Sequence, residues 1–416
     1  MNYLFIHNNF PGQFQHIASH LGARPGNRVV FLTQPNENRM SGVESVVYTP
    51  FRESTPGIHH YVLDVERAVI LGQAVHEACR GLKAQGFRPD VVVGHSGWGE
   101  TLFVKDVWPD VPLLGYFEFY YHSDGNDVGF DPAEPPTLDD APRLRLKNAV
   151  NLLAAQSADW GLTPTRWQAS LYPPEIRKRL SVLHEGVDTA VASPAAGASV
   201  QMPGMERPLT TDDEVITFVN RNLEPYRGYR VFMRALPDIL ARRPNAHVLM
   251  VGGNGISYGA PPPGGGSWHQ VMLDEVGDRL DLSRVHFLGT IPHADFIGLM
   301  RLSAVHVYLT YPFVLSWSLL ESMSCGCTVV ASDVAPVREV IQDGKNGLLV
   351  DFFDQVALAD AIDRVLDHPD RMKKMREAAR RTVLERYDLR TVALPRQLDL
   401  VQALAEGRDP KKALAS

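Results

Sequence analysis

Residues 305–332 give the strongest indication of the fold, because strand, loop, helix and strand signals follow one another there. The β-branched run Val305–Leu309 predicts a buried strand. After a loop, a serine opens a short helix that Gly326 ends, and a second apolar run predicts another buried strand. This order of elements is typical of a parallel sheet covered by helices.

The loop of this stretch leads into the positive end of the predicted helix. Free backbone N–H groups and serine hydroxyls at such a position bind phosphate oxygens. Glu321 follows one turn later, where its carboxylate could accept hydrogen bonds from sugar hydroxyls. A phosphate site beside a hydroxyl acceptor predicts a nucleotide-sugar pocket. A local alternative remains, because Ser318 and Glu321 also fit a capping box, in which the glutamate only satisfies a backbone N–H.

Short apolar runs alternate with amphipathic stretches throughout the first half, which predicts a parallel sheet with helices on both faces. The expected strands are Tyr3–His7, Arg28–Leu32, Asp90–Gly94, Leu113–Glu118, Trp160–Leu162 and Ser181–Leu183. The expected helices are Gln13–Leu21, Val62–Gln85, Trp98–Lys105, Leu144–Gln156 and Arg166–Leu171.

A segment rich in Ala, Pro, Gly and Ser, Thr189–Thr211, has no periodicity and is interpreted as a linker. A second alternating set follows it. Its expected strands are Val215–Asn220, His247–Val251, Val285–Leu288, Val305–Leu309, Thr328–Ala331 and Leu348–Val350.

The 416 residues are too many for one ordinary core and fit two α/β domains. We expect a Rossmann-like domain over residues 1–190, then the linker and a second Rossmann-like domain over residues 191–391. The final segment, 392–416, has helical apolar spacing and is expected to return to the first domain. Parallel sheets whose carboxyl ends face each other would leave a ligand cleft between them.

Charge and cysteine usage narrow the class of protein. A net charge of −7 argues against nucleic acid as the main partner. The first residues lack the basic and apolar regions of a signal peptide, and three cysteines without a Cys-x-x-Cys pair favour reduced thiols. We therefore expect a cytoplasmic protein. Arg143, Arg145 and Lys147 could contact anionic lipid at the inner membrane face, although a solvated helix face is the stronger expectation.

Three polar residues stand at predicted strand ends in the first half, namely His7, His95 and Glu118. In a doubly wound sheet these positions line the ligand crevice, so they are candidate site residues. Gly12 opens the first helix and would let a ligand approach the backbone closely. The alternative for Gly12 is an ordinary turn glycine.

Two arginines, Arg221 and Arg227, flank a turn after the first strand of the second half. Their guanidinium groups could converge on a diphosphate, each through charge-assisted hydrogen bonds. The alternative is a solvated charged turn in which Glu224 pairs with them. Gly253, at the end of the next strand, adds a glycine loop. No Asp-x-Asp spacing is present, so we expect the arginines, rather than a metal ion, to neutralise the diphosphate.

On these residues the chain resembles the retaining, nucleotide-sugar-dependent glycosyltransferases of family 4, which have the GT-B fold. The resemblance is strongest in the segment 320–333, LESMSCGCTVVASD, and includes the FPGQ loop at 10–13, the HEGVD segment at 184–188 and the Arg221–Gly228 turn. It implies that Glu321 holds the ribose hydroxyls and that Ser316, Trp317 and Ser318 cradle the donor sugar and phosphates.

The chain departs from the family pattern at three positions. Phe313 stands where the first glutamate of the Glu-x7-Glu motif is expected. The second basic residue of the diphosphate pair, usually a lysine one residue nearer, is Arg227. Glu118 occupies a strand end where relatives often carry histidine.

The resemblance implies a retaining transfer of a hexose from a nucleotide diphosphate to a hydroxyl acceptor, without a cofactor. Arg221 and Arg227 would stabilise the departing phosphate, and Glu118 or His95 would position the acceptor. Two alternatives stay open: a nucleotide-sugar 2-epimerase of the same architecture, and a degenerate nucleotide-binding partner subunit, which Phe313 motivates. No residue pattern selects the nucleotide, the sugar, the acceptor or the oligomeric state.

Overall fold

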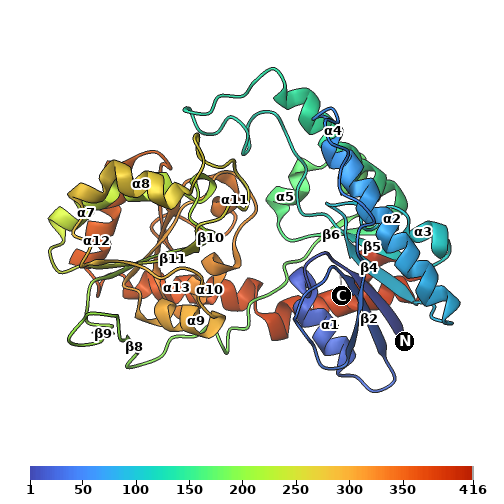
Figure 1. The fold of residues 1–416 in the computed structure, drawn as a ribbon. Coiled ribbons are helices and arrows are strands. Elements are labelled where there is room, and N and C mark those ends of the chain that lie inside the picture. Colours follow the sequence, from blue (N-terminus) through green and yellow to red (C-terminus); the bar gives the residue numbers. More distant parts are fainter. Residues whose placement is uncertain (415–416) are drawn as a thin grey trace. The chain divides into compact units, whose positions relative to one another are not determined.

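The computed structural model describes residues 1–414 and contains two compact units. The first unit combines residues 1–186 with the final segment from Arg390, and the second unit spans residues 187–389 (Figure 1). Each unit is built on a parallel β-sheet with helices on both faces, which is the Rossmann-like α/β architecture that the alternating sequence pattern predicts.

The sheet of the first unit is parallel throughout, in the order β3-β2-β1-β4-β5-β6-β7. The order reverses between β1 and β4, so a topological switch point lies between their carboxyl ends. The strands are β1 Asn2–Ile6, β2 Arg28–Thr33, β3 Val43–Val47, β4 Val91–His95, β5 Leu113–Tyr116, β6 Trp160–Thr163 and β7 Leu180–Val182.

Alternate residues of β1 point to opposite faces of this sheet. Tyr3 and Phe5 pack against α1 and the C-terminal helix α14, whereas Leu4 and Ile6 pack in the core beneath α2 and α4. Apolar contacts with this face of the sheet thus hold the last segment on the first unit. The helices are η1 Gly12–Phe14, α1 Gln15–Gly22, α2 Leu63–Ala84, α3 Val104–Val107, α4 Asp140–Ser157, α5 Arg166–Leu171, α6 Pro174–Arg177, the π-helical turn η4 Leu389–Ala393 that joins the units, α14 Leu394–Ala405 and α15 Pro410–Ala413.

The sheet of the second unit is also parallel, in the order β12-β11-β10-β13-β14-β15. Its switch point lies between β10 and β13. The strands are β10 Val215–Asn222, β11 His247–Gly253, β12 Val285–Phe287, β13 Val305–Tyr308, β14 Thr328–Ser332 and β15 Leu348–Val350.

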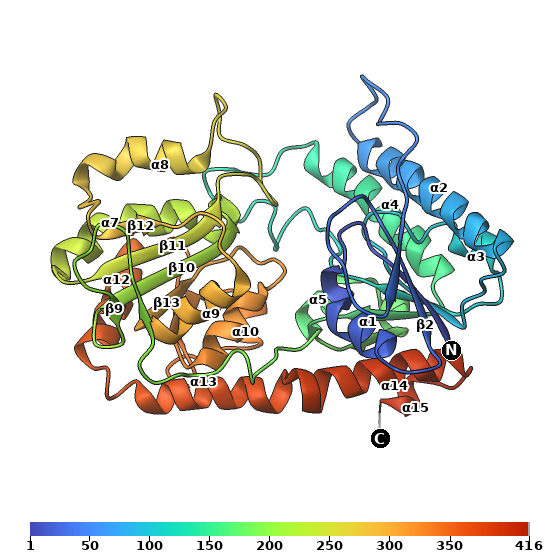
Figure 2. The same ribbon diagram turned by 60° about the horizontal axis from the view of Figure 1, so that its bottom comes forward.

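Two groups of helices cover this second sheet (Figure 2). Helix α7 contacts α8 and α12, and α10 contacts α9 and α13. The linker contains a short antiparallel pair, β8 Ser199–Val200 and β9 Leu209–Thr210. The helices are η2 Pro225–Arg227, α7 Tyr229–Arg242, α8 Trp268–Val276, η3 Gly277–Arg279, α9 His293–Leu302, α10 Trp317–Cys325, α11 Ala335–Arg338, α12 Gln355–Asp367 and α13 Lys373–Arg386.

The local structure differs from the sequence-based expectation in two places. The predicted helix 98–105 is wrong and shrinks to α3, because the chain before it forms turns. Gly99 has a φ of +102°, and a Cβ there would come within 2.4 Å of the Ala68 backbone, so this segment is shaped by close contact with α2. No sequence pattern predicts strand β3, because its partly exposed residues lack a long apolar run. Within residues 1–414, no helix combines the length and apolar character needed to cross a bilayer.

Candidate functional site

The polar strand ends of the first unit lie around its topological switch point. His7 follows β1, His95 ends β4 and Glu118 comes two residues after β5. The imidazole rings of His7 and His95 are 5.2 Å apart between centroids, so the predicted clustering of these residues is what the structure shows.

Gln13 joins these side chains into a network. Its amide oxygen lies 2.6 Å from Nε2 of His7, and its amide nitrogen donates to Oε1 of Glu118 at 2.9 Å. Nε2 of His95 is 3.7 Å from Oε2 of Glu118, which is too long for a hydrogen bond. This buried nitrogen has no hydrogen-bond partner within residues 1–414. The network therefore ends on one nitrogen that remains available.

Burial and charge set the protonation states in this network. Burial, together with the nearby His95, lowers the pKa of His7 to about 3, so His7 is neutral near pH 7. Burial alone would raise the pKa of Glu118, but the attraction of His95 and His7 and the hydrogen bond from Gln13 outweigh it and leave the pKa lowered. Glu118 is thus an ionised hydrogen-bond acceptor rather than an acid.

Three residues that shape this region are not predicted as site residues from the sequence. Gln13 is one, because its place in the first helical turn gives no sign of the network. Trp98 stacks on His95 with ring centroids 3.9 Å apart, and Glu100 is fully buried and accepts from the Tyr48 hydroxyl at 3.2 Å. Burial raises the pKa of Glu100.

Gly12 has a structural requirement of its own. Its φ is +51°, and a Cβ would come within 2.5 Å of the His7 ring. The glycine therefore allows the first loop to close over His7, which is compatible with the predicted close approach of a ligand to this backbone.

In the second unit, Arg221 lies at the carboxyl end of β10, inside a register shift of the ladder with β11. Its side chain is exposed and forms no hydrogen bond or ion pair within the described residues. Gly253 ends β11 beside it, where a Cβ would meet Oδ1 of Asn222 at 2.7 Å. The solvated, paired turn proposed as an alternative therefore does not hold for Arg221, whose guanidinium is free to bind an anion.

Arg227 differs sharply from Arg221, because it is only 5% exposed. Its Nη1 donates to Oγ1 of Thr310 and to the carbonyl oxygen of Val314, both at 2.8 Å. These bonds tie the turn after β10 to the loop after β13, across the switch point. Arg227 thus holds the loop that precedes α10.

An aromatic cage surrounds the Arg227 guanidinium. Its Cζ atom lies 4.9 Å from the Tyr258 ring centroid and 5.9 Å from that of Phe313. Phe313 is 6% exposed and packs against Tyr226 and Tyr258 at centroid distances of 5.4 and 5.0 Å. The residue that replaces the expected glutamate thus packs beneath the loop as part of this cage.

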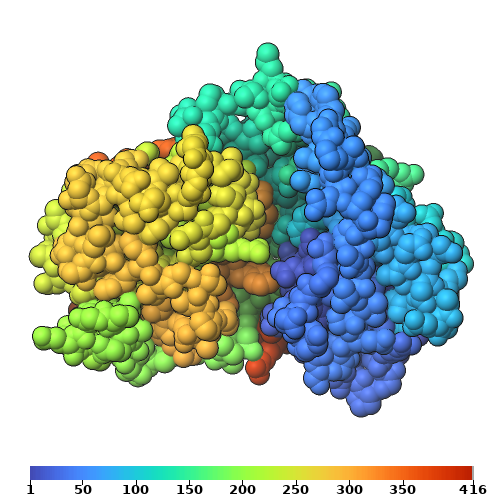
Figure 3. Space-filling view, viewed as in Figure 1, coloured from blue at the N-terminus to red at the C-terminus, as the bar shows by residue number. Residues whose placement is uncertain are grey.

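Glu224 anchors the glycine-rich loop that carries Tyr258. The carboxylate is fully buried and accepts from the backbone N–H groups of residues 257, 258 and 259, each at 3.2 Å. Asn222 adds bonds to Ser257 and Gly255 at 2.7 and 3.1 Å. The loop and α8 form part of the outer surface, in yellow in Figure 3. The buried Glu224 therefore fixes a segment that lies at the surface.

Helix α10 begins as predicted, after a serine-rich turn. The N-cap is Ser316, whose hydroxyl accepts from the Ser318 N–H, and the Ser316 N–H donates to the Tyr308 hydroxyl at 2.8 Å. Trp317, the first helical residue, is 43% exposed. Because the cap is Ser316, Glu321 does not occupy the third helical position, and the capping-box alternative is wrong.

Glu321 instead pairs with a residue from another helix. Nε2 of His293, the first residue of α9, lies 2.6 Å from its Oε1. The hydrogen bond and charge of Glu321 raise the pKa of His293, although partial burial opposes this. The second carboxylate oxygen of Glu321 has no hydrogen-bond partner within residues 1–414, so it can accept from a ligand.

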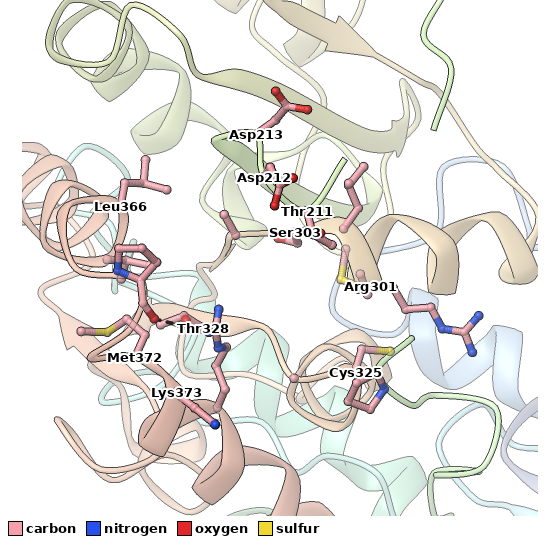
Figure 4. Close-up of a pocket in the computed structure, with 18 of the residues that line it drawn as sticks. Thr211, Asp212, Asp213, Arg301, Ser303, Cys325, Thr328, Leu366, Met372 and Lys373 are labelled. Carbon is pink, nitrogen blue, oxygen red and sulfur yellow. Dashed lines mark hydrogen bonds between the residues drawn. The ribbon is translucent and has the colours of Figure 1, made fainter. Parts of the chain in front are cut away.

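A cavity of about 720 Å³ lies at the other end of the second sheet, near the amino ends of β10, β13 and β14 (Figure 4). Its lining mixes cations such as Lys373 with anions such as Asp212. Arg301 extends away from the hollow and donates to the carbonyl oxygens of Ser193 and Val191, both at 2.9 Å. The cavity therefore adjoins the linker and is separate from the carboxyl strand ends that carry the candidate donor-binding residues.

The basic residues considered for lipid contact are largely engaged within the first unit. Arg143 pairs with Asp140 at 2.8 Å, and the Lys147 ammonium lies 4.0 Å from the Tyr121 ring centroid and 4.0 Å from Asp64. Two of the three basic residues are thus paired within the unit, and contact with a membrane stays a prediction. Within residues 1–414, no cluster of three His, Cys, Asp or Glu side chains has the geometry to hold a metal ion.

Comparison with known families gives two adjoining matches. Residues 25–192 match the group described as glycosyl transferase family 4, and residues 205–382 match the glycosyl transferases group 1. Among curated relatives, the D-inositol 3-phosphate glycosyltransferase of Acidothermus cellulolyticus is 29% identical over 231 residues, covering 54% of this chain and 49% of the relative. That of Corynebacterium urealyticum is 30% identical over 216 residues, covering 47% and 48%. The chain spans about half the length of the curated relatives it matches.

Solved structures resemble the chain over nearly its whole length. Sucrose-phosphate synthase from Thermosynechococcus elongatus superposes with a TM-score of 0.71 at 18% identity, covering 98% of this chain and all of that one. HepE of Anabaena, in complex with UDP-glucose, gives a TM-score of 0.63 at 15% identity, covering 98% and 99%. At these identities the likeness establishes the shared fold.

Proposed function

The chain belongs to the GT-B glycosyltransferases of the family 4 type, and we propose that it transfers a hexose from a nucleotide-diphosphate sugar to a hydroxyl acceptor with retention of configuration. The observation that carries the proposal is the pair of unsatisfied groups in the second unit. Arg221 offers an exposed guanidinium at the carboxyl end of β10, and Glu321 offers a free carboxylate oxygen in the first turns of α10. These groups match a diphosphate and the hydroxyls of a ribose.

The second unit is proposed to bind the donor. Its serine-capped helix supplies N–H groups and hydroxyls at Ser316 and Ser318 for phosphate or sugar oxygens. Arg227, already bonded to Thr310 and Val314 and lying beside the Tyr258 ring, would support this loop, and its remaining N–H groups could donate to the diphosphate. The UDP-glucose complex of HepE, a protein of the same fold, supports a nucleotide sugar as the ligand class.

Charge neutralisation at the departing phosphate is the main catalytic task in this proposal. As the glycosidic bond breaks, negative charge grows on the diphosphate, and the Arg221 guanidinium at the strand end would stabilise that charge. The acceptor attacks from the same face, and the departing phosphate oxygen takes the proton of the acceptor hydroxyl. No metal ion or cofactor is required by this scheme.

The first unit is proposed to position the acceptor. The ionised Glu118 carboxylate accepts a hydrogen bond from the acceptor hydroxyl, and Nε2 of His95 provides the unpartnered ring nitrogen beside it. Because Glu118 remains ionised, it orients the hydroxyl rather than protonating a leaving group.

The test begins with a thermal-shift screen of nucleotide sugars, followed by turnover of the stabilising donor with and without sugar, glycolipid and polyol acceptors. Acceptor-dependent release of nucleoside diphosphate, retained in EDTA, and an α-linked product from an α-linked donor are the expected results. Acceptor-independent conversion of the sugar would favour an epimerase. Binding without any turnover would indicate a partner subunit, and activity restored only by added Mg²⁺ or Mn²⁺ would contradict the metal-free scheme.

A further inference from the structure

His293 lies at the start of α9, one crossover away from the helix that carries Glu321. The two side chains meet at 2.6 Å between Nε2 and Oε1, within the range of a charge-assisted hydrogen bond. The Glu321 side chain is 17% exposed and that of His293 is 62% exposed. The carboxylate is therefore held from the solvent side by a ring that no sequence motif marks.

The pairing gives the two carboxylate oxygens of Glu321 different roles. One oxygen is bonded to His293, and the other has no partner within the described chain. A glutamate side chain has several rotatable bonds, so an unrestrained carboxylate would lose conformational entropy each time it bound a ligand. The bond to His293 removes part of that loss beforehand.

His293 is the first residue of α9, and this location argues against an incidental surface contact between His293 and Glu321. Helix N-termini disfavour a cationic side chain, yet the bond to Glu321 raises the pKa of His293. The imidazole ring centroid also lies 5.9 Å from that of Phe296 on the same helix. His293 thus contacts both Glu321 and Phe296.

We propose that His293 is a positioning residue, which holds the Glu321 carboxylate so that its free oxygen accepts the ribose hydroxyls of the donor. This inference rests on the proposed function, because it assigns Glu321 to the nucleotide. His293 acts through Glu321 and is not required to touch the ligand itself.

A double-mutant cycle tests the inference, with His293→Ala, His293→Gln, Glu321→Gln and the double variant His293→Ala/Glu321→Gln. Calorimetry with UDP, GDP and ADP first identifies the diphosphate that the wild-type protein binds most tightly, and that compound is the probe. We expect His293→Ala to weaken its binding about 5- to 10-fold and to raise the donor KM with little change in kcat. His293→Gln can donate the same hydrogen bond and should stay within about threefold of the wild type.

The decisive measurement is the effect of His293→Ala in the Glu321→Gln background. If His293 acts through the carboxylate, the second change should cost less than about twofold there. His368→Ala, which removes an exposed histidine after α12, is the matched control and should leave binding unchanged. Thermal unfolding of each variant excludes a general loss of structure.

Two results would overturn the inference while leaving the proposed function intact. One is wild-type affinity in His293→Ala, and the other is an undiminished loss in the Glu321→Gln background, which would mean that His293 contacts the nucleotide directly. Failure of the wild-type protein to bind any of the diphosphates would instead overturn the proposed function and, with it, this inference.

Discussion

At the carboxyl edge of the first sheet, the polar side chains form one network around Gln13, in which Nε2 of His95 has no hydrogen-bond partner within residues 1–414. At the carboxyl edge of the second sheet, bonded and unbonded side chains stand beside each other. In the first unit, Gln13 bonds to both His7 and Glu118. In the second, Arg221 is free while Arg227 is buried and bonded. The two sheets share a topology, but that topology does not decide which polar side chains are bonded within the protein and which are free to bind a ligand. The contacts of each side chain decide this.

The two arginines show this division most directly. They are six residues apart and carry the same charge, so the sequence alone makes them equivalent candidates for a diphosphate. The structure gives Arg227 an aromatic cage and two oxygen partners, and leaves Arg221 in solvent. Because Arg227 is bonded within the protein and Arg221 is not, substitution of Arg227 should lower stability, whereas substitution of Arg221 should lower ligand affinity.

Glu224→Ala should have the strongest effect, because it removes the buried anchor of the glycine-rich loop. Three backbone N–H groups lose their acceptor, and the free energy of unfolding should fall by about 3 kcal/mol. Urea denaturation measures the change. Glu377→Ala, at an exposed position on α13, is the control and should stay within about 0.5 kcal/mol of the wild type. Equal stability of the two variants would show that the loop is not held by Glu224.

Arg221→Ala should affect affinity rather than stability. Because a charge-assisted contact is lost, nucleoside diphosphate should bind about 10- to 100-fold more weakly. The unfolding curve should not change. Arg227→Ala should lower the unfolding midpoint as well, since Thr310 and Val314 lose their donor. Calorimetry and denaturation on both variants, with exposed Arg371→Ala as control, check the contrast. Similar losses of stability in both variants would contradict the distinction between a structural Arg227 and a ligand-binding Arg221.

Each unit contains a buried histidine whose pKa burial lowers to about 3, His7 in the first and His306 in the second. Below pH 6.5 the unfolded chain binds protons that these native side chains do not, so stability should fall as pH falls. Each histidine contributes a slope of about 1.4 kcal/mol per pH unit between pH 6 and 5. His7→Gln and His306→Gln should each reduce the slope measured by denaturation at pH 7.5, 6 and 5. An unchanged slope would mean that the native ring titrates normally.

Glu321→Gln should have the weakest effect, and only on the ligand. Since Glu321 does not cap α10, its substitution should leave thermal unfolding nearly unchanged while weakening nucleoside diphosphate binding by about tenfold. The comparison with Arg221→Ala ranks the ribose contact below the phosphate contact. Full binding and activity in Glu321→Gln would remove Glu321 from the proposed donor site.

Short-range patterns in the sequence are sufficient to predict most of the fold. Alternating apolar runs and amphipathic stretches predict nearly all strands of both sheets, because buried parallel strands and their covering helices impose strong local periodicities. Polar residues at strand ends predict the cluster of His7, His95 and Glu118, since parallel strands bring their carboxyl ends to one edge. The serine cap and Gly326 set the ends of α10 in the same local way.

Which of these side chains remain free depends on long-range packing. Arg227 meets Thr310 and Tyr258 through connections dozens of residues long, and Glu321 meets His293 from the preceding helix. The local sequence allows a capping box at Glu321 because Ser318 stands three residues before it, but the cap of the helix is Ser316. Side-chain partners are set by how crossover elements pack on the sheet, and that packing depends on contacts between residues far apart in the chain, which no short window of sequence contains.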